Sequence, residues 1–213
     1  WAERADLYAG FERGIDADEG ACLSQIPRKQ RAVVRKTLDA GLSDCVELSA
    51  KTVYALYSRT VRDHGTPVFP PGLFTELMSV FGPDCDVLTV YKDGEPISSV
   101  LSFYFKGRVL PYYTGSLRSN DFMYWRLMRR AVDRGCTIFD FGRSKVGTGP
   151  FSFKKNWGFP PRPIKHQFHL NRSTELPNLN PTNPKFELLV EGWRRLPLPL
   201  ANFMGPFISR NLG

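Results

Sequence analysis

The residues best suited to chemistry lie in one stretch, FDFGRSKVGTGPFSFKKNWGF, which runs from Phe139 to Phe159. Glycine-rich turns let backbone amides approach an anion, and cationic side chains add charge beside them. Arg143 and Lys145 are expected to hold substrate phosphates, Arg143 through bidentate hydrogen bonds and Lys145 as a point charge. Ser144 lies between them and either contacts substrate or serves the turn itself. The stretch predicts a site for an anionic ligand.

Two familiar phosphate-binding loops do not fit this stretch. A Walker loop needs a lysine after its second glycine, and Gly142 to Gly147 has the spacing, but Thr148 occupies the lysine position. A dinucleotide-binding fingerprint needs a third glycine where the helix meets the sheet, and Pro150 follows Gly149 instead. What remains is a turn after a strand, followed by a short helix.

That short helix is predicted to begin near Pro150, a residue compatible with a first helical turn. Phe153 and Trp157 are four residues apart and therefore lie on one side of it. Lys154 and Lys155 project from neighbouring sides, so ammonium groups are expected beside a pocket floored by aromatic rings. The alternative is that the aromatic residues are core and the lysines are solvated.

The elements that must position these residues begin with a helix within residues 26–42. Pro27 marks its first turn and Gly41 lies just past its end. Arg28, Arg31 and Arg35 share one face of this helix, which is either a solvated surface or a phosphate-contacting one.

Further helices are predicted near residues 51–64 and 71–81. Residues 86–113 then read as three strands of an antiparallel meander, with turns at Asp93-Gly94 and Lys106-Gly107. The next helix begins at Asn120 or Asp121 and ends before Gly135.

The remaining segments are two strands, a connector and a final helix. The strands are predicted in residues 136–141 and 164–170, and a Pro/Asn-rich connector follows. The last helix carries an apolar stripe made of Phe186, Leu189, Val190 and Trp193. It is expected to dock on the domain, with contact to a membrane surface or a partner as the alternative.

This order of elements is that of the GNAT acyltransferase fold. The predicted class is α/β (α+β): a mixed, mostly antiparallel sheet flanked by helices, whose central parallel strands splay apart and leave a substrate cleft. GNAT enzymes hold the pyrophosphate of coenzyme A on a glycine-rich loop before the central helix, where this chain has only YYTGSLRSNDFMYW. Tyr112 and Tyr113 end the facing strand and either line the cleft or pack against the central helix.

Composition bounds the class of protein and its partners. The chain has 213 residues, 42% of them hydrophobic, which suits one domain with an appendage. Its net charge of +8 favours anionic partners. The sequence has no run approaching the roughly 18–20 apolar residues of a membrane span. It does not begin with Met, so it is expected to be a piece of a longer chain.

The four cysteines are widely spaced and form no C-x-x-C pair, so neither a zinc site nor a disulfide scaffold is predicted. Reduced thiols indicate a cytoplasmic protein, and a position at the inner face of the membrane is the alternative. We expect each cysteine to be a small buried side chain; they are Cys22, Cys45, Cys85 and Cys136.

Several long motifs resemble the FemAB-related proteins of exosortase (PEP-CTERM) and exopolysaccharide gene clusters. They are IPRKQRAVVRK, GTPVFP, NDFMYWRLMRRA, NPKFELLVEGWRRLPL and the stretch from Phe139 to Phe159. The resemblance covers residues 26–213 and implies three parts: a remnant of a preceding GNAT-like half in residues 1–25, a GNAT-like acyltransferase domain in 26–170, and a connector with an amphipathic helix in 171–213.

The resemblance also implies roles for residues. Fem ligases are aminoacyl-tRNA-dependent peptidyltransferases with a Phe-Lys pair at the active site, which corresponds to Phe153 and Lys154. Lys154 would stabilise the oxyanion of a tetrahedral intermediate. Asp140 would accept the amine proton, orient Arg143 or cap the loop. Tyr113 would donate a hydrogen bond to the oxyanion.

Three functions remain open from the sequence. The first is acyl or aminoacyl transfer to an amine of a peptidoglycan or exopolysaccharide precursor, with aminoacyl-tRNA as donor. The second is an N-acyltransferase that uses acyl-CoA or acyl carrier protein. The third is a non-catalytic basic module that binds RNA or an anionic glycan. The expected partners are a phosphate-bearing substrate, tRNA and a membrane surface, with no metal and no bound cofactor.

Overall fold

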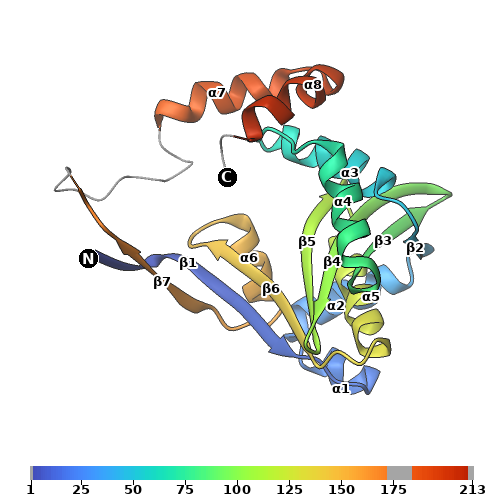
Figure 1. Cartoon of the computed structure of the whole chain (residues 1–213). Coiled ribbons are helices and arrows are strands. Elements are labelled where there is room, and N and C mark those ends of the chain that lie inside the picture. Colours follow the sequence, from blue (N-terminus) through green and yellow to red (C-terminus); the bar gives the residue numbers. More distant parts are fainter. Residues whose placement is uncertain (1, 172–183, 211–213) are drawn as a thin grey trace.

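The computed structural model describes residues 2–171 and 184–210 (Figure 1). A seven-stranded sheet has the order β2-β3-β4-β5-β6-β1-β7. Its strands are β1 (Ala2–Gly14), β2 (Leu42–Glu47), β3 (Cys85–Lys92), β4 (Glu95–Phe105), β5 (Arg108–Ser116), β6 (Ile138–Lys145) and β7 (Arg162–Phe168). The helices are α1 (Glu19–Ser24), α2 (Arg28–Leu38), α3 (Lys51–Asp63), α4 (Pro71–Phe81), α5 (Asn120–Asp133), α6 (Gly149–Asn156), α7 (Pro184–Arg195) and α8 (Leu198–Ser209), with a 3-10 turn, η1 (Gly82–Asp84).

The predicted meander is confirmed in β3, β4 and β5, which are joined by two tight turns. Both residues of each turn have positive φ, at Asp93-Gly94 and at Lys106-Gly107, the conformation that suits the twist of a two-residue hairpin. β5 and β6 run parallel, and the other neighbouring strands run antiparallel. The predicted fold class, a mixed and mostly antiparallel sheet flanked by helices, is therefore confirmed.

Four features were not predicted: the strands β1 and β2, the short helix α1, and the division of the expected C-terminal helix into α7 and α8. β1 lies between β6 and β7 and pairs with both. Residues 2–14 thus supply an interior strand of the same sheet as the residues after 25. The sheet is continuous across the domain boundary expected after residue 25. Most of the expected connector falls in residues 172–183, which lie outside the described residues.

The core has one layer on each face of the sheet because successive strand residues point to opposite faces. On β4, Val100 packs in the cluster that contains the buried side of α5, including Trp125. Its neighbour Leu101 packs in the other cluster, which contains Val53 of α3 and Phe74 of α4. Figure 1 shows α3 and α4 on one side of β4 and β5, with α2 and α5 on the other.

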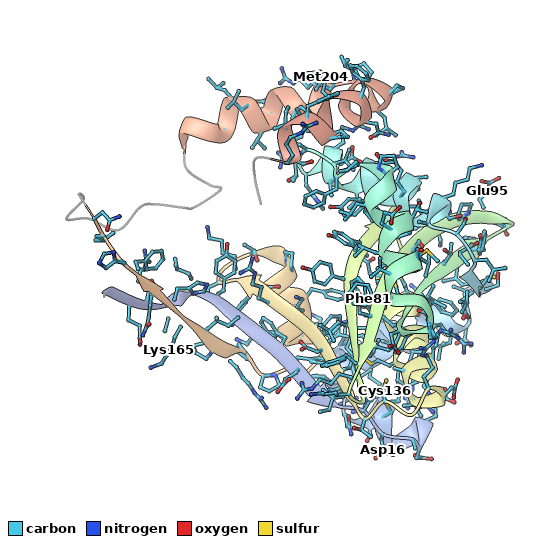
Figure 2. All side chains as sticks on the ribbon, viewed as in Figure 1. Asp16, Phe81, Glu95, Cys136, Lys165 and Met204 are labelled. Carbon is cyan, nitrogen blue, oxygen red and sulfur yellow. The ribbon has the colours of Figure 1, made fainter. Side chains whose placement is uncertain are left out.

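The two C-terminal helices dock on α3, as predicted for the last helix. In the junction between them, the carbonyl oxygens of Arg194 and Leu196 accept hydrogen bonds from Arg62 Nη1 at 3.4 and 3.2 Å. Asn202 Nδ2 of α8 lies 3.4 Å from Ser58 Oγ of α3. Figure 2 labels Met204 on the side of α8 that faces away from the sheet.

The predicted apolar stripe of α7 is only partly buried. Val190 and Trp193 are half-buried, whereas Leu189 is 70% exposed, and the Phe186 side chain lies outside the described ones. Of the cysteines, the exception to the prediction is Cys45, which is exposed. All are free thiols, and the buried ones are Cys22, Cys85 and Cys136.

The end of β5 lies directly against the backbone of α3 because Gly115 has no side chain. A methyl group on Gly115 would overlap the backbone nitrogen of Tyr57 and the carbonyl carbon of Leu56. The next residue, Ser116, donates its backbone N–H to Thr60 Oγ1 of α3 at 2.9 Å. Gly115 thus sets the distance between the helix and the strand.

Gly115→Ala should destabilise the fold by an amount at or above the upper end of the roughly 1–3 kcal/mol that overpacking usually costs, because backbone atoms must move. Urea denaturation measures this effect. Gly72→Ala is the matched control, because a methyl group on Gly72 of α4 would have no heavy atom within 4 Å. Equal stability of Gly115→Ala and the wild type would show that this contact does not hold α3.

Candidate active site

The parallel strands β5 and β6 separate soon after they begin. Their pairing is limited to Arg108 with Ile138 and Val109 with Phe139. Beyond these residues β6 continues along β1, with which it pairs as far as Lys145. The predicted splay between adjacent parallel strands is therefore present, and it leaves a wedge at the centre of the sheet.

A cavity of about 560 Å³ occupies this wedge. Residues of five elements and of the turn after α3 line it: Thr60, Val61, Asp63, His64, Thr114, Ser116, Asn120, Tyr124, Phe141, Gly149, Pro150, Phe153 and Lys154. A cavity of this size suits a small organic group rather than a macromolecule. We call it the cleft.

Lys154 reaches the cleft from α6, and the protein fixes its ammonium group. Lys154 Nζ donates to the carbonyl oxygens of Phe141 at 2.7 Å and of Arg143 at 3.2 Å. Both carbonyls belong to β6 beyond the point where its pairing with β5 ends. An ammonium group has three N–H donors, so these bonds leave one for a ligand.

The surroundings of Lys154 are largely apolar. Its Nζ lies 5.6 Å from the ring centre of Phe11 and 5.8 Å from that of Phe141. Burial lowers the pKa of the Lys154 ammonium from its ordinary 10.5 to about 8, and the charge of Asp140 acts in the opposite direction. At neutral pH the group is still mostly protonated, and it is a stronger proton donor than an exposed lysine.

The strand that precedes α6 is longer than predicted. The stretch after Phe141 was expected to be a flexible turn, but β6 continues through Arg143, Ser144 and Lys145, which pair with Gly10, Ala9 and Tyr8 of β1. Gly142, with φ of 66°, forms a bulge opposite β1. The turn itself comes later, where Thr148 Oγ1 accepts a hydrogen bond from the N–H of Phe151 at the start of α6.

These β6 residues lie beside the cleft rather than in its lining. Arg143 is exposed, with its guanidinium 5.1 Å from the ring centre of Tyr8. Ser144 is buried, and burial lowers the pKa of the half-buried Lys145. Asp140 Oδ1 accepts the N–H of Gly142 at 2.8 Å. Of the three roles considered for Asp140, this contact corresponds to capping the loop.

Phe153 lines the cleft, whereas the other aromatic residues expected at the site do not. Trp157 is fully buried, and its Nε1 donates to Asp121 Oδ1 at 3.0 Å. Tyr113 packs on α3 and α4, with its ring 4.8 Å from that of Phe74. Trp157 therefore belongs to the core, and Tyr113 is half-buried against the core on the α3 and α4 side of the sheet.

Tyr112 and Lys155 also lie outside the cleft lining. Tyr112 is 62% exposed and its ring packs 5.6 Å from that of Phe103. Lys155 lines a separate hollow of about 300 Å³ between α6 and α2, beside Gln30. Its side chain thus leaves the helix on a different side from Lys154.

Sequence reasoning missed the polar residues that other elements bring to the cleft. Tyr124 of α5 lies with its hydroxyl 3.3 Å from Thr114 Oγ1 of β5. Burial raises the pKa of Tyr124, so its phenol remains a hydrogen-bond donor at neutral pH. The available signal was weak, because Tyr124 is simply one of several aromatic residues in a helix with an apolar face.

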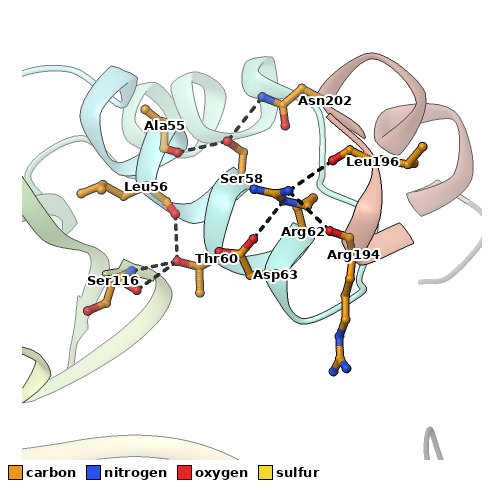
Figure 3. A network of polar contacts seen from close by, with 10 residues as sticks. All are labelled: Ala55, Leu56, Ser58, Thr60, Arg62, Asp63, Ser116, Arg194, Leu196 and Asn202. Atoms are coloured by element: carbon orange, nitrogen blue, oxygen red, sulfur yellow. Dashed lines mark hydrogen bonds and ion pairs between the residues drawn. The ribbon is translucent and has the colours of Figure 1, made fainter. Parts of the chain in front are cut away.

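The end of α3 supplies the opposite wall of the cleft. Thr60 Oγ1 accepts the backbone N–H of Ser116 and itself donates to the carbonyl of Leu56 at 2.9 Å (Figure 3). Asp63 and His64 follow one turn later, and both are exposed and line the cleft. Carbonyls at a helix C-terminus favour a positively charged neighbour, so this wall suits a cationic amine.

Comparison with known proteins assigns the family. Residues 25–155 match the acetyltransferase (GNAT) domain family, and the chain belongs to this family. The solved structure of FemX resembles it with a TM-score of 0.66 and 17% identity, over 73% of this chain and 59% of FemX. No curated protein matches the sequence.

Two further solved structures share the fold. L-PGS from Bacillus licheniformis has a TM-score of 0.51 and 16% identity, over 76% of this chain and 61% of L-PGS. A conserved protein of unknown function from Bacteroides thetaiotaomicron VPI-5482 has a TM-score of 0.51 and 10% identity, over 77% of this chain and 60% of that protein. The chain thus spans about three fifths of each of the three structures. At these identities the likeness is one of fold.

Two kinds of feature are absent from the part of the chain that the structure describes. Within residues 2–171 and 184–210, no group of three or more His, Cys, Asp or Glu side chains is placed to hold a metal ion. Over the same residues, no helix combines the length and the apolar character needed to cross a bilayer.

The lowered pKa of Lys154 predicts a pH-dependent stability. Between about pH 8 and 10.5 the unfolded chain keeps a proton on Lys154 that the folded chain has released. Unfolding then takes up a proton, so raising the pH through this window stabilises the fold.

Lys154→Met removes this titration. The free energy of unfolding of the wild type minus that of Lys154→Met should therefore rise from pH 7.5 to pH 10.5, as measured by urea denaturation. Lys155→Met is the control, because Lys155 is exposed. A difference between wild type and Lys154→Met that stays constant with pH would contradict the burial of the ammonium group.

Proposed function

We propose that this protein transfers an acyl or aminoacyl group to an amine of a peptidoglycan or exopolysaccharide precursor. The observation that carries the proposal is the ammonium of Lys154, which is fixed in the cleft by two β6 carbonyls and keeps one N–H for a ligand. Membership of the GNAT family supports acyl transfer. The fold shared with FemX and L-PGS supports an aminoacyl donor.

In the proposed reaction the acceptor nitrogen attacks the carbonyl carbon of an ester or thioester. A C–N bond forms, the carbonyl oxygen becomes negative, and the C–O or C–S bond to the donor then breaks. The acceptor nitrogen loses a proton, and the leaving oxygen or sulfur gains one. The charge of Lys154 stabilises the negative oxygen, because a preorganised donor in a partly dehydrated site needs little rearrangement.

The other polar groups of the cleft suit the remaining tasks. Histidine is the side chain most often used for proton transfer near neutral pH, so we assign the removal of the amine proton to His64. Tyr124, which stays protonated, is a second hydrogen-bond donor to the oxyanion. Asp140, whose carboxylate caps the bulge, supports the charge on Lys154 from outside the cleft.

The donor is proposed to be aminoacyl-tRNA, with an acyl-CoA or acyl carrier protein thioester as the alternative. The segment that leads into α5 favours the former. It consists of Leu117, Arg118 and Ser119, without the glycines that bring backbone amides to a pyrophosphate. Arg143 and Lys145, beside the cleft on β6, are the proposed contacts for donor or acceptor phosphates.

Lys154→Met should lower turnover by roughly 10²–10³-fold, the usual effect of removing one oxyanion-stabilising donor. The assay compares aminoacyl-tRNA and acyl-CoA donors with amine-bearing precursors, with mass spectrometry of the product. Lys155→Met is the matched control, because it removes the same charge from the adjacent position of α6, outside the cleft. Unchanged turnover in Lys154→Met would remove Lys154 from the mechanism, and transfer from neither donor would count against the proposed reaction.

One observation favours a second candidate function, a basic module that binds RNA or an anionic glycan. Arg28, Arg31 and Arg35 share a face of α2, as predicted, and line one hollow of about 480 Å³. Arg31 also binds the carbonyl oxygens of Ile26 and Ser24, so part of its role is to hold the start of α2.

For this second function, Arg28→Glu with Arg35→Glu should weaken RNA binding and reduce its salt dependence, because each lost phosphate contact lowers the number of counterions released. Arg31 is left unchanged to preserve α2. Filter binding of a short RNA over a range of salt concentrations is the measurement. Identical affinity and salt slope in the double variant would eliminate the α2 face as a nucleic-acid site.

A further inference from the structure

The helix α8 exposes most of its large apolar side chains and buries its small ones. The buried positions are Ala201, Gly205 and Ser209, four residues apart on the side that faces the domain. The exposed positions lie at helical spacing on the other side: Leu200, Phe203, Met204, Phe207 and Ile208. We call this second set the apolar ridge.

The small residues explain how α8 can dock while the apolar ridge stays outside. A methyl group on Gly205 would come within 2.8 Å of Val68 Cγ1 and 2.9 Å of its backbone nitrogen, so the helix approaches the chain at Val68 closely only because this position is glycine. Phe203 is 70% exposed and Phe207 56% exposed. Docking on the domain therefore leaves a continuous row of large apolar side chains exposed to solvent.

The chemistry of the apolar ridge favours a lipid surface over a protein partner. Protein interfaces carry about one hydrogen bond per 100–200 Å², but the five side chains of the ridge offer no hydrogen-bonding group apart from a thioether. Hydrocarbon requires no such bonds. Large exposed apolar patches on soluble folds mark contact sites, and Phe and Leu are typical of the buried side of interfacial helices.

The charges around the apolar ridge complement an anionic surface. α8 contains no acidic residue, and cations lie at both of its ends. Arg195 precedes it, with its side chain 76% exposed and paired with Glu191. Arg210 follows it, with its guanidinium 5.3 Å from the ring centre of Phe207. This places a cation beside the apolar side chains, where lipid phosphates meet the acyl region.

We infer that α8 docks this protein on an anionic phospholipid surface, with the apolar ridge inserted among the headgroups and Arg195 and Arg210 contacting phosphates. The same α3 that contacts α7 through Arg62 and α8 through Ser58 ends in the cleft wall at Asp63. Docking in this way would hold the cleft close to the membrane plane.

Co-sedimentation with vesicles tests the inference without any substrate. The purified chain should bind vesicles of equal parts phosphatidylglycerol and phosphatidylcholine more tightly than vesicles of phosphatidylcholine alone. Phe203→Ser with Phe207→Ser should lower the partition coefficient at least about ten-fold, because two aromatic side chains no longer enter the bilayer. The matched control is Leu48→Ser with Phe105→Ser, which removes side chains that are 99% and 64% exposed elsewhere on the molecule. It should bind like the wild type.

A second variant addresses the charge. Arg195→Gln with Arg210→Gln should weaken binding to the anionic vesicles by roughly five-fold per cation, with little effect on phosphatidylcholine vesicles. If the serine variant has a lowered melting temperature, the result for the Arg195→Gln, Arg210→Gln variant decides whether α8 binds the anionic surface. The inference is overturned if the wild type binds neither vesicle or if neither variant pair weakens binding. It is also overturned if sedimentation velocity shows a dimer that the serine variant abolishes, since a second copy would then cover the ridge.

Discussion

The cleft depends on two side chains that replace the hydrogen bonds of a strand pair. Where β5 and β6 separate, each would leave backbone groups without a partner, and such groups are costly to bury. On the β5 side, Thr60 Oγ1 accepts the N–H of Ser116. On the β6 side, Lys154 Nζ donates to the carbonyls of Phe141 and Arg143. Side chains therefore bind backbone groups on both walls of the wedge.

This arrangement links stability with chemistry at the same atoms. Lys154 serves as a structural donor to β6 and, in the proposed reaction, as the group that stabilises negative charge. Burial destabilises its charged form and so lowers its pKa to about 8, and a further hydrogen bond from the ammonium group becomes more favourable. Thr60 joins α3 to β5, and the same helix end brings His64 to the cleft. The proposed catalytic geometry is thus built from contacts between elements distant in sequence.

The sequence was informative where local patterns decide structure. Helix punctuation at Pro27 and Gly41 and the turns at Asp93 and Lys106 led to correct elements. It was least informative for β1, because charged residues at both ends of this segment obscure the pattern of a strand. β1 is an interior strand because β6 and β7 lie on its two sides.

At the site, the Phe-Lys motif pointed to two of the four α6 residues that line the cleft, whereas Tyr113 and Trp157, also expected at the site, lie outside its lining. A strand sends neighbouring side chains to opposite faces, so Thr114 lines the cleft while Tyr113 packs on α3 and α4. Trp157 follows the end of α6 and points into the core. His64 could not be found from local pattern, because it comes from a helix that precedes the meander.

The position of β1 has a consequence for how the chain folds. Tyr8 pairs with Lys145 and with Ile164, so this strand can be completed on neither side until the last strands of the sheet exist. Forming contacts between residues so distant in sequence costs the chain much conformational entropy before any stabilising energy is gained, which slows folding. Until β1 adds to it, β6 presents an unpaired edge, at which an extended segment of another chain can also pair. Exchange of β1 between two molecules is therefore the misassembly to which this topology is most exposed.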